Sequence, residues 1–424
     1  MVFFLENYLI ITYSLFIEQC VEVHNLARKI STRVTRLRTP LIAKLLSKTW
    51  ELQSKGVKIY NFSAGQPGFQ PPIELRKYLS QLLLQDFPQL YKYTPIEGIK
   101  ELREAISDDL RETYDFEINT ESQIVITAGG EEALYLSLLV TVNEGEEVVL
   151  FDPTFLEYEP LVNLVGGKPV FVKTVEDKGY QPDIDDLTEK VSRKTKALIL
   201  TSPDNPTGRI IGIEEAKAIA DLAEDYGFWV FSDETYQFMI FEGEHIPMYR
   251  FENIRDKVGI IGSFSKDTGL SGWRIGFIYG SKELIGEVKK AKEYITLSTP
   301  SIAQYAVVYF LRNKLRNTYT KYIVDEYRKR RDVLYREIKE KLPEAKPFKP
   351  QAAFYMFVNM EAYMRKHGFR TGMELADYLL EKAYVATIPG EACGPSSFKH
   401  IRFSFSSVNE NDIVEAIDKI SKIL

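Results

Sequence analysis

Short apolar segments, separated by stretches with helical spacing of their apolar residues, constrain the fold of this chain more than any other feature. Most of these segments are apolar over their whole length, which is typical of strands that are buried on both faces of a sheet. Strands of this kind that alternate with helices predict an α/β fold with a mostly parallel sheet covered by helices on both sides. The expected strands are residues 123–127, 147–151, 169–172, 197–201, 229–232, 258–262 and 274–279, with helices such as 131–142 and 214–226 between them.

The pattern changes after residue 300, and the change indicates a second layer. The expected elements there are a long charged helix at 312–342, strands at 354–358 and 400–404, and a closing helix at 409–423. They predict a smaller α/β domain that also takes in the start of the chain. We expect residues 71–304 to form the large domain and residues 27–70 and 305–424 to form the small one.

The first 26 residues form a separate segment with two open interpretations. Their apolar stretches are interrupted by Glu6 and Asn7, and no basic residue precedes them. This pattern fails as a signal peptide and is too broken to span a membrane. We expect either an amphipathic arm that packs on the body or on a partner subunit, or extra sequence from an upstream start codon.

Composition excludes several classes of function. The hydrophobic content of 45% and the charged content of 27% are typical of a globular protein with a substantial core, and the net charge of −6 provides no basic surface for nucleic acid. Two cysteines, Cys20 and Cys393, make neither a disulfide framework nor a metal site, so we expect a reducing cytoplasm. Four histidines without the spacing of metal ligands predict that there is no metal centre.

Lys266 lies just beyond the expected strand 258–262, accompanied by Ser263, Ser265 and Arg274. A single lysine in a loop is usually just a solvated side chain. However, open α/β sheets bind ligands at the carboxyl ends of their strands, where a desolvated amine can form an imine with an aldehyde. The serine hydroxyls and the guanidinium suit a phosphate. An aldehyde and a phosphate in one molecule indicate pyridoxal phosphate (PLP).

Asp233 follows the expected strand 229–232, and Tyr236 lies three residues further on. A carboxylate beside a pyridine nitrogen keeps that nitrogen protonated, so that the ring withdraws electrons from the substrate. The tyrosine hydroxyl is a candidate donor to the phenolic oxygen of the ring. The alternative interpretation, which these residues taken alone favour, is a polar cap between a strand and a helix.

The tetrapeptide Asn-Pro-Thr-Gly at residues 205–208 follows the expected strand 197–201. Its two halves are ordinary turn dipeptides. The complete tetrapeptide is much more specific, and we interpret the Asn205 amide as a donor to the ring oxygen of the cofactor, on a turn stiffened by Pro206.

Gly129 and Gly130 precede a helix that is expected to begin near Glu131. Glycines allow close approach of the backbone, and the amides at a helix N-terminus bind phosphate, so we expect backbone contacts there with the Glu131 charge turned away. A simple strand-to-helix turn explains the glycine pair equally well. Phe155, beyond another strand end, is a candidate for stacking on the pyridine face, although such aromatics more often belong to the core.

Tyr93 and Arg402 are candidates of two other kinds. The Tyr93 hydroxyl is a candidate phosphate ligand, and otherwise a surface side chain. Arg402 lies inside the apolar strand 400–404, where an unpaired cation is costly. Its partner is either a structural acid or the α-carboxylate of an amino-acid substrate.

Taken together and in order, these segments resemble the class I and II (fold-type I) PLP-dependent aminotransferases, from about residue 27 to the C-terminus. The lysine motif, Ser-x-Ser-Lys followed by Gly-x-Arg-x-Gly, and the Asn-Pro-Thr-Gly turn are its most specific parts. The resemblance implies the PLP-dependent transferase fold of type I and a ping-pong exchange between an amino acid and a 2-oxo acid such as 2-oxoglutarate. It also implies a homodimer with active sites at the subunit interface.

The resemblance assigns a role to each candidate residue. Lys266 would be the Schiff-base lysine and the acid–base group, and Asp233 would pair with the pyridinium. The ring would be contacted by Asn205, Tyr236 and Phe155. The phosphate would be held by Ser263, Ser265, Arg274 and the backbone at Gly129, Gly130 and Glu131, with Tyr93 reaching the phosphate of the neighbouring subunit. The substrate would be bound by Arg402, Gly65 and Asn205.

The preferred substrate is less closely constrained. Related enzymes that prefer dicarboxylates can supply a second arginine across the interface from the segment that corresponds to residues 293–301, and this segment contains none. Its absence favours an aromatic, aliphatic or mixed specificity over a strict aspartate enzyme. The run Gln-Pro-Gly-Phe at residues 66–69 also differs from the Gly-Glu-Pro-Asp-Phe that is commoner in the family, so we expect the lid near the substrate to differ.

Two other functions share the same fold. A lyase or synthase, such as a carbon–sulfur lyase or an aminocyclopropane-carboxylate synthase, would use the same PLP residues and release ammonia. A PLP-binding sensor domain of a transcription regulator would have a basic DNA-binding module ahead of this fold, whereas the N-terminal segment here is short, apolar and not basic. We therefore expect an aminotransferase.

Overall fold

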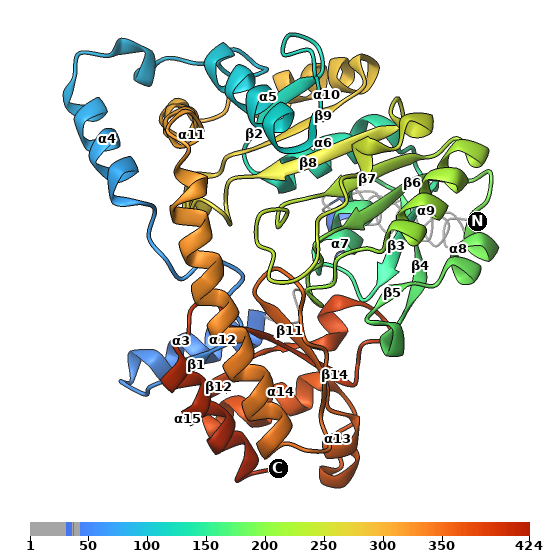
Figure 1. Ribbon diagram of the computed structural model, residues 1–424. Coiled ribbons are helices and arrows are strands. Elements are labelled where there is room, and N and C mark those ends of the chain that lie inside the picture. Colours follow the sequence, from blue (N-terminus) through green and yellow to red (C-terminus); the bar gives the residue numbers. More distant parts are fainter. Residues whose placement is uncertain (1–30, 36, 38–42) are drawn as a thin grey trace, which may run out of the picture. The chain divides into compact units, whose positions relative to one another are not determined.

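The computed structural model describes residues 31–35, 37 and 43–424 (Figure 1). The expected N-terminal arm, residues 1–26, lies outside the described residues. Residues 1–38 form one compact unit, in which helix α2 (Thr32–Thr35) is described, and residues 39–424 form another. All the other described helices and strands belong to the second unit.

The central sheet contains every strand that the sequence predicts, each with ends within three residues of the expected ones. Its strands are β2 (Ile124–Thr127), β3 (Glu147–Asp152), β4 (Lys168–Val175), β5 (Gln181–Pro182), β6 (Thr195–Thr201), β7 (Trp229–Asp233), β8 (Val258–Ser263) and β9 (Gly276–Gly280). They are arranged in the order β2-β9-β8-β7-β6-β3-β4-β5 (Figure 1). The run from β4 to β8 is parallel, which confirms a mostly parallel sheet, whereas β9 is antiparallel to both its neighbours and β5 to β4.

Helices cover both faces of this sheet, which explains why its strands are apolar throughout. Within β6, Ala197 and Ile199 pack into one core and Leu198 and Leu200 into another. The first core includes side chains of α6 (Gly130–Thr141), α7 (Tyr158–Leu164) and α10 (Lys282–Ile295). The second includes side chains of α5 (Lys100–Tyr114), α8 (Ile184–Lys190), α9 (Ile213–Tyr226) and α11 (Ser301–Arg312).

A second layer is built on an antiparallel sheet with the order β10-β11-β14-β13. Its strands are β10 (Lys346–Pro347), β11 (Tyr355–Asn359), β13 (Ile388–Pro389) and β14 (His400–Ser404), and β1 (Tyr60–Asn61) pairs separately with β12 (Val385–Ala386). The helices of this layer are α3 (Ala43–Ser54), α12 (Tyr319–Lys341), α13 (Glu361–His367), α14 (Gly372–Ala383) and α15 (Glu410–Ser421). The strands expected at 354–358 and 400–404 and the closing helix are therefore confirmed.

The helix expected over residues 312–342 is wrong at its start. The chain leaves α11 after Arg312, and Lys314 has a left-handed φ of 52°. A left-handed residue cannot continue a right-handed helix, so α12 begins anew at Tyr319.

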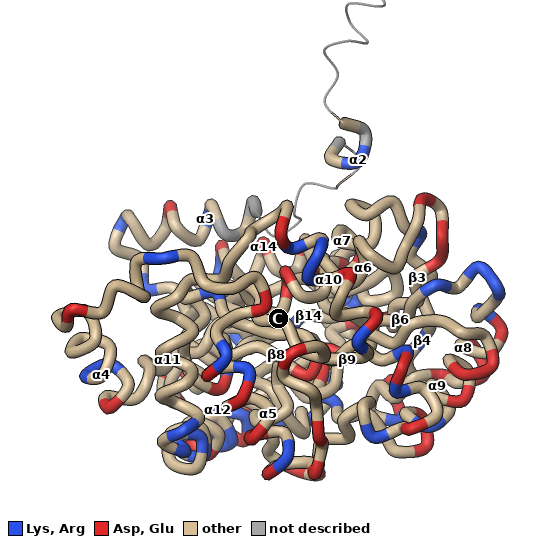
Figure 2. Tube along the Cα trace, turned by 90° about the horizontal axis from the view of Figure 1, so that it is seen from above, with Lys and Arg blue, Asp and Glu red and all other residues tan. Residues whose placement is uncertain are grey.

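Charged residues of both signs lie along the outer helices, as α8 and α12 show, and α4 (Ile73–Leu84) carries them too (Figure 2). None of the helices in residues 31–35 and 43–424 has the length and apolar composition of a membrane span.

The parallel strands determine where polar side chains meet. Strands β3, β6, β7 and β8 run in the same direction and end with Asp152, Thr201, Asp233 and Ser263. The carboxyl ends of parallel strands lie along the same edge of a sheet, which is where open α/β sheets bind ligands.

Candidate active site

A cavity of about 570 Å³ opens at this edge, between the central sheet and the second layer. It is lined by most of the residues predicted from the sequence: Gly65, Gly130, Glu131, Phe155, Asn205, Asp233, Tyr236, Ser263, Ser265, Lys266, Arg274 and Arg402. Residues from strands that are far apart in sequence therefore surround one space of small-molecule size.

Lys266 lies in the loop after β8, where its amine donates a hydrogen bond to the Gly65 carbonyl at 2.7 Å. Burial lowers the pKa of Lys266 to about 8; the Asp233 carboxylate opposes this shift, and the charges of Arg402 and Arg274 add to it. An amine with this pKa is partly neutral near physiological pH, and only the neutral amine is a nucleophile.

The Asp233 carboxylate, at the end of β7, is fixed through both oxygens. Its Oδ1 accepts a hydrogen bond from the Thr235 backbone N–H at 3.1 Å, and its Oδ2 accepts one from the Tyr158 hydroxyl at 2.7 Å. Tyr158 was not singled out in the sequence because it reads as an ordinary core aromatic at the start of a short helix. Its hydroxyl lies 2.6 Å from that of Thr201, which also lines the cavity.

A compact anion-binding cradle is formed where β2 leads into α6. Gly129 has a φ of 91°, and a β-carbon there would lie 2.5 Å from Arg274 Nη2, so that the guanidinium packs directly on the backbone. A β-carbon at Gly130 would lie 3.5 Å from Thr235 Oγ1 and 3.6 Å from Ser263 Cβ. The α6 N-terminus, a guanidinium and hydroxyls thus converge, which suits a phosphate.

Arg274 has no ion pair with a carboxylate of the described chain, which leaves its charge available to a ligand. Its Nη1 donates only to the Ser271 carbonyl, at 3.1 Å. Thr235 is a further hydroxyl at this cradle that sequence reasoning missed. Its position two residues after Asp233, on the same loop, was the available signal.

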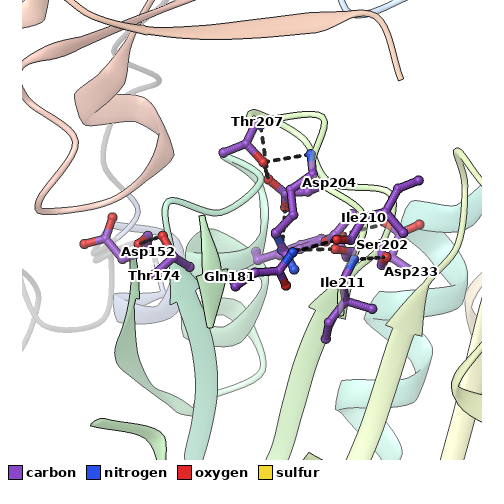
Figure 3. A network of polar contacts seen from close by, with 12 residues as sticks. Asp152, Thr174, Gln181, Ser202, Asp204, Thr207, Ile210, Ile211 and Asp233 are labelled. Atoms are coloured by element: carbon purple, nitrogen blue, oxygen red, sulfur yellow. Dashed lines mark hydrogen bonds and ion pairs between the residues drawn. The ribbon is translucent and has the colours of Figure 1, made fainter. Parts of the chain in front are cut away.

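The turn at residues 202–209 is held rigid from below (Figure 3). The Asp204 carboxylate accepts hydrogen bonds from the backbone N–H of Thr207 at 3.1 Å and from its hydroxyl at 2.5 Å, and Arg209 lies 3.5 Å from Asp204. The Ser202 backbone N–H donates to the Asp233 carbonyl at 3.2 Å, which ties this turn to the end of β7. Asn205 is therefore presented on a fixed backbone.

Arg402 projects from β14 into the cavity with 2% of its surface exposed. Its guanidinium donates to Asn205 Oδ1 at 2.9 Å and to the Ser63 carbonyl at 3.2 Å, and it lies 4.4 Å from the centre of the Tyr355 ring. Within the described chain no carboxylate forms an ion pair with it, and its Nε has no hydrogen-bond partner. A structural acid is thus not its partner here, and a buried cation without a counter-ion favours an anionic ligand.

Aromatic side chains complete the cavity. The Tyr236 and Tyr355 hydroxyls are 2.8 Å apart, and burial raises the pKa of both groups, so they stay protonated at physiological pH. Phe155 packs edge-on against Tyr158, with ring centres 5.3 Å apart. Tyr355 was missed because the strand pattern of β11 marks it only as a buried residue.

Tyr93 is the predicted residue that lies apart from the cavity. It is 84% exposed and borders a shallow surface depression with Tyr91 and residues 298–301. No atom of this chain explains a contact between Tyr93 and the cradle. Among the described residues there is also no group of His, Cys, Asp and Glu side chains that could bind a metal ion.

Known proteins match this chain over nearly its whole length. The model of the family "Aminotransferase class I and II" matches residues 57–420. The chain is 32% identical over 397 residues to a probable aspartate/prephenate aminotransferase of Aquifex aeolicus, covering 93% of this chain and 98% of that one. It is 28% identical over 381 residues to aromatic-amino-acid aminotransferase 2 of Thermococcus litoralis, covering 89% and 95%. A solved structure of a single mutant of Thermus thermophilus aspartate aminotransferase matches with a TM-score of 0.87 at 29% identity, covering 94% of this chain and 100% of that one.

A lysine of lowered pKa beside an anion cradle, at the carboxyl edge of a mostly parallel sheet, defines the class of fold-type I PLP enzymes. The chain belongs to the class I and II aminotransferases. It is accordingly a PLP-dependent aminotransferase whose substrates are an amino acid and a 2-oxo acid, and the lyase or synthase alternative is not favoured.

The cavity fits this cofactor. The cradle at Gly129 and Gly130 has no room for a side chain, and it carries a guanidinium free of carboxylates, as a phosphate requires. An amine that is partly neutral and a fixed carboxylate lie in the same cavity, as an aldehyde and a pyridine nitrogen require.

Proposed function

We propose that this protein transfers the amino group of an amino acid to 2-oxoglutarate in a ping-pong exchange, with Lys266 as the residue that attaches the cofactor. The observation that carries the proposal is the position of the Lys266 amine in one cavity with the anion cradle, Asp233 and the unpaired Arg402. The exchange itself follows from the family. The roles of individual residues follow from the contacts described above.

Bound PLP supplies an aldehyde carbon for amines and a ring that withdraws electrons from the substrate α-carbon. Asp233 would face the pyridine nitrogen and keep it protonated, because a fixed carboxylate favours the charged form of a neighbouring base. Asn205 would donate from its amide Nδ2, since its Oδ1 is occupied by Arg402. Tyr236 would donate to the same ring oxygen, and Phe155 would pack on the ring.

The phosphate would be held by the cradle residues Gly129, Gly130, Glu131, Ser263, Ser265 and Arg274. Once the substrate amine has replaced it, the Lys266 amine is free to accept the α-proton and return it to another carbon. Its lowered pKa suits this shuttle, because the best acid–base groups titrate near the working pH. Arg402 and Gly65 would bind the substrate, with the guanidinium on the α-carboxylate.

The pKa of Lys266 gives a pH-dependent prediction. Below about pH 8 the amine is protonated and does not attack an aldehyde, whereas above it the amine is neutral. In protein freed of cofactor, the rate of PLP attachment should therefore rise with a midpoint near pH 8 and then level off. Stopped-flow absorbance after mixing with PLP measures this rate. A rate that still rises towards pH 10.5, the ordinary lysine value, would contradict the burial of this amine.

We further propose an aromatic, aliphatic or mixed amino-donor specificity. The cations that line the cavity are Lys266, Arg274 and Arg402, each of which already has a role. The remaining walls are mainly apolar, with Trp50, Leu134, Phe155, Leu156, Leu161 and Ile388. Glu131 and Glu157 also line the cavity and would repel a second carboxylate on the donor.

A spectroscopic titration tests the proposed function. We expect purified protein with PLP to show a visible absorbance band that disappears with a preferred amino acid and returns on addition of 2-oxoglutarate. Aromatic or aliphatic amino acids should act at lower concentrations than aspartate. A band that persists while ammonia accumulates would indicate the lyase or synthase, and a missing band would refute the attachment at Lys266.

We propose that the protein is a homodimer in which Tyr93 reaches the phosphate of the partner subunit. Large apolar side chains are exposed near this tyrosine in sequence and in the segment beyond α10, notably Leu84, Tyr91, Tyr294 and Leu297. Exposed groups of this size favour an interface. Sedimentation equilibrium would measure the mass, and a monomer at micromolar concentration would contradict the proposal.

The division into a large domain, residues 71–304, and a small domain, residues 27–70 and 305–424, stays a prediction. The two sheets described above support it, since their strands lie within the two expected parts. A cytoplasmic location also stays a prediction. It depends on the sparse use of cysteine.

A further inference from the structure

We propose that Tyr158 is a positioning residue for Asp233: its hydroxyl fixes one carboxylate oxygen, so that the carboxylate stays ionised and directed at the pyridine nitrogen of the cofactor. This inference rests on the proposed role of Asp233. It adds a residue of α7 to the site, although α7 provides none of the residues that the sequence predicted.

The geometry of the contact is specific. Tyr158 Oη lies 2.7 Å from Asp233 Oδ2 and 2.6 Å from Thr201 Oγ1. A tyrosine hydroxyl has one proton, and an ionised carboxylate can only accept. Tyr158 therefore donates to Asp233, and the Thr201 hydroxyl donates to Tyr158. The result is a chain of two hydrogen bonds in one direction, in which each bond polarises the next.

The surroundings of Tyr158 keep this direction fixed. Its side chain is 2% exposed, and burial, with the Asp233 charge as the next cause, raises the pKa of Tyr158 well above its ordinary value. The hydroxyl therefore stays protonated at every pH at which the protein works. Asp233 Oδ1 is held by the Thr235 N–H, so the carboxylate has a fixed plane and little freedom to rotate.

A neutral donor is better suited to this position than a cation. A lysine or arginine beside Asp233 would compete with the pyridinium for the carboxylate charge. A phenol stabilises the ionised carboxylate without neutralising it. The Tyr158 ring also packs on Phe155, so one side chain supports two of the proposed ring contacts.

The test is a double-mutant cycle between Tyr158→Phe and Asp233→Asn. Phenylalanine retains the ring and its packing, and removes only the hydrogen bond to a charged group. We expect kcat to fall about 10- to 100-fold in Y158F, with KM changed less than twofold. The dissociation constant of PLP, measured by equilibrium titration, should rise about tenfold. In the D233N background, Y158F should change kcat less than twofold, because its partner charge is already gone.

Two further variants complete the test. Tyr279→Phe is the matched control, because Tyr279 is equally buried but its hydroxyl has no hydrogen-bond partner, so kcat should change less than twofold. Thr201→Val should lower kcat in the wild-type background and not in Y158F, and it tests the same chain if Y158F folds poorly. Equal losses from Y158F in both backgrounds, or a kcat within twofold of wild type, would overturn the proposal. If D233N itself leaves kcat unchanged, the role proposed for Asp233 fails first.

Discussion

Replacement of Lys266 by alanine is expected to abolish transamination and the visible absorbance band while leaving the fold intact. The amine lies half-buried at a loop, hydrogen-bonded to a single backbone carbonyl, so its loss removes little packing. It is proposed both to attach the cofactor and to move the α-proton, and loss of a general acid–base group alone costs up to about 10⁴-fold in rate. Activity should therefore fall by at least about that factor. Absorbance, single-turnover kinetics and circular dichroism measure the three properties.

Lys292 provides a matched control for this experiment. It is buried in α10, its pKa is lowered by burial, and it donates to Thr296 Oγ1 at 3.1 Å, but it does not line the cavity. Lys292→Met should leave the visible band and the rate close to wild type. Transamination by Lys266→Ala above about 1% of the wild-type rate would refute the assignment of Lys266.

Replacement of Asp233 by alanine should retain the visible band but lower kcat about 100- to 1,000-fold, the range for loss of a preorganised electrostatic group. Without the carboxylate, the pyridine nitrogen would lose its proton and withdraw fewer electrons from the substrate. The amine of Lys266 stays in place, so the cofactor should still attach. Attachment should also begin at lower pH, because Asp233 raises the pKa of Lys266 against the effect of burial.

Asp152 is the comparison residue for Asp233. It also ends a strand at this edge and is buried, but its carboxylate accepts from the Ser396 backbone N–H at 2.9 Å and from the Ser397 hydroxyl, and it is not part of the cavity wall. Asp152→Asn should lower stability and leave kcat within about threefold of wild type. An undiminished kcat in Asp233→Ala would remove that residue from its proposed role.

The sequence predicts the central sheet well because burial on both faces leaves an unambiguous apolar pattern. It also predicts the residues at strand ends, such as Asp233 and Lys266, since parallel strands bring their carboxyl ends to one edge. The direction of β9 is not predictable in this way, because an apolar run reads the same in either direction. Nor is the break at Lys314, since the charged pattern continues through it.

The residues that were missed share a different property. Tyr158 and Tyr355 enter the site from elements outside the parallel strands, and their hydroxyls gain a role only from the partner that tertiary packing provides. Local sequence carries no record of that partner. Arg402 was recognised as costly in an apolar strand, but its contact with Asn205 joins two layers of the molecule and depends on their packing.

The alternation along β6, with successive side chains committed to opposite cores, has a consequence for protein engineering. A substitution inside such a strand disturbs one packed core or the other, so the central sheet leaves little scope for redesign. The apolar cavity wall, by contrast, is contributed largely by residues outside these strands, including Trp50, Leu156 and Ile388. Libraries directed at these three positions can therefore explore new donor amino acids without exhausting the stability that the scaffold supplies.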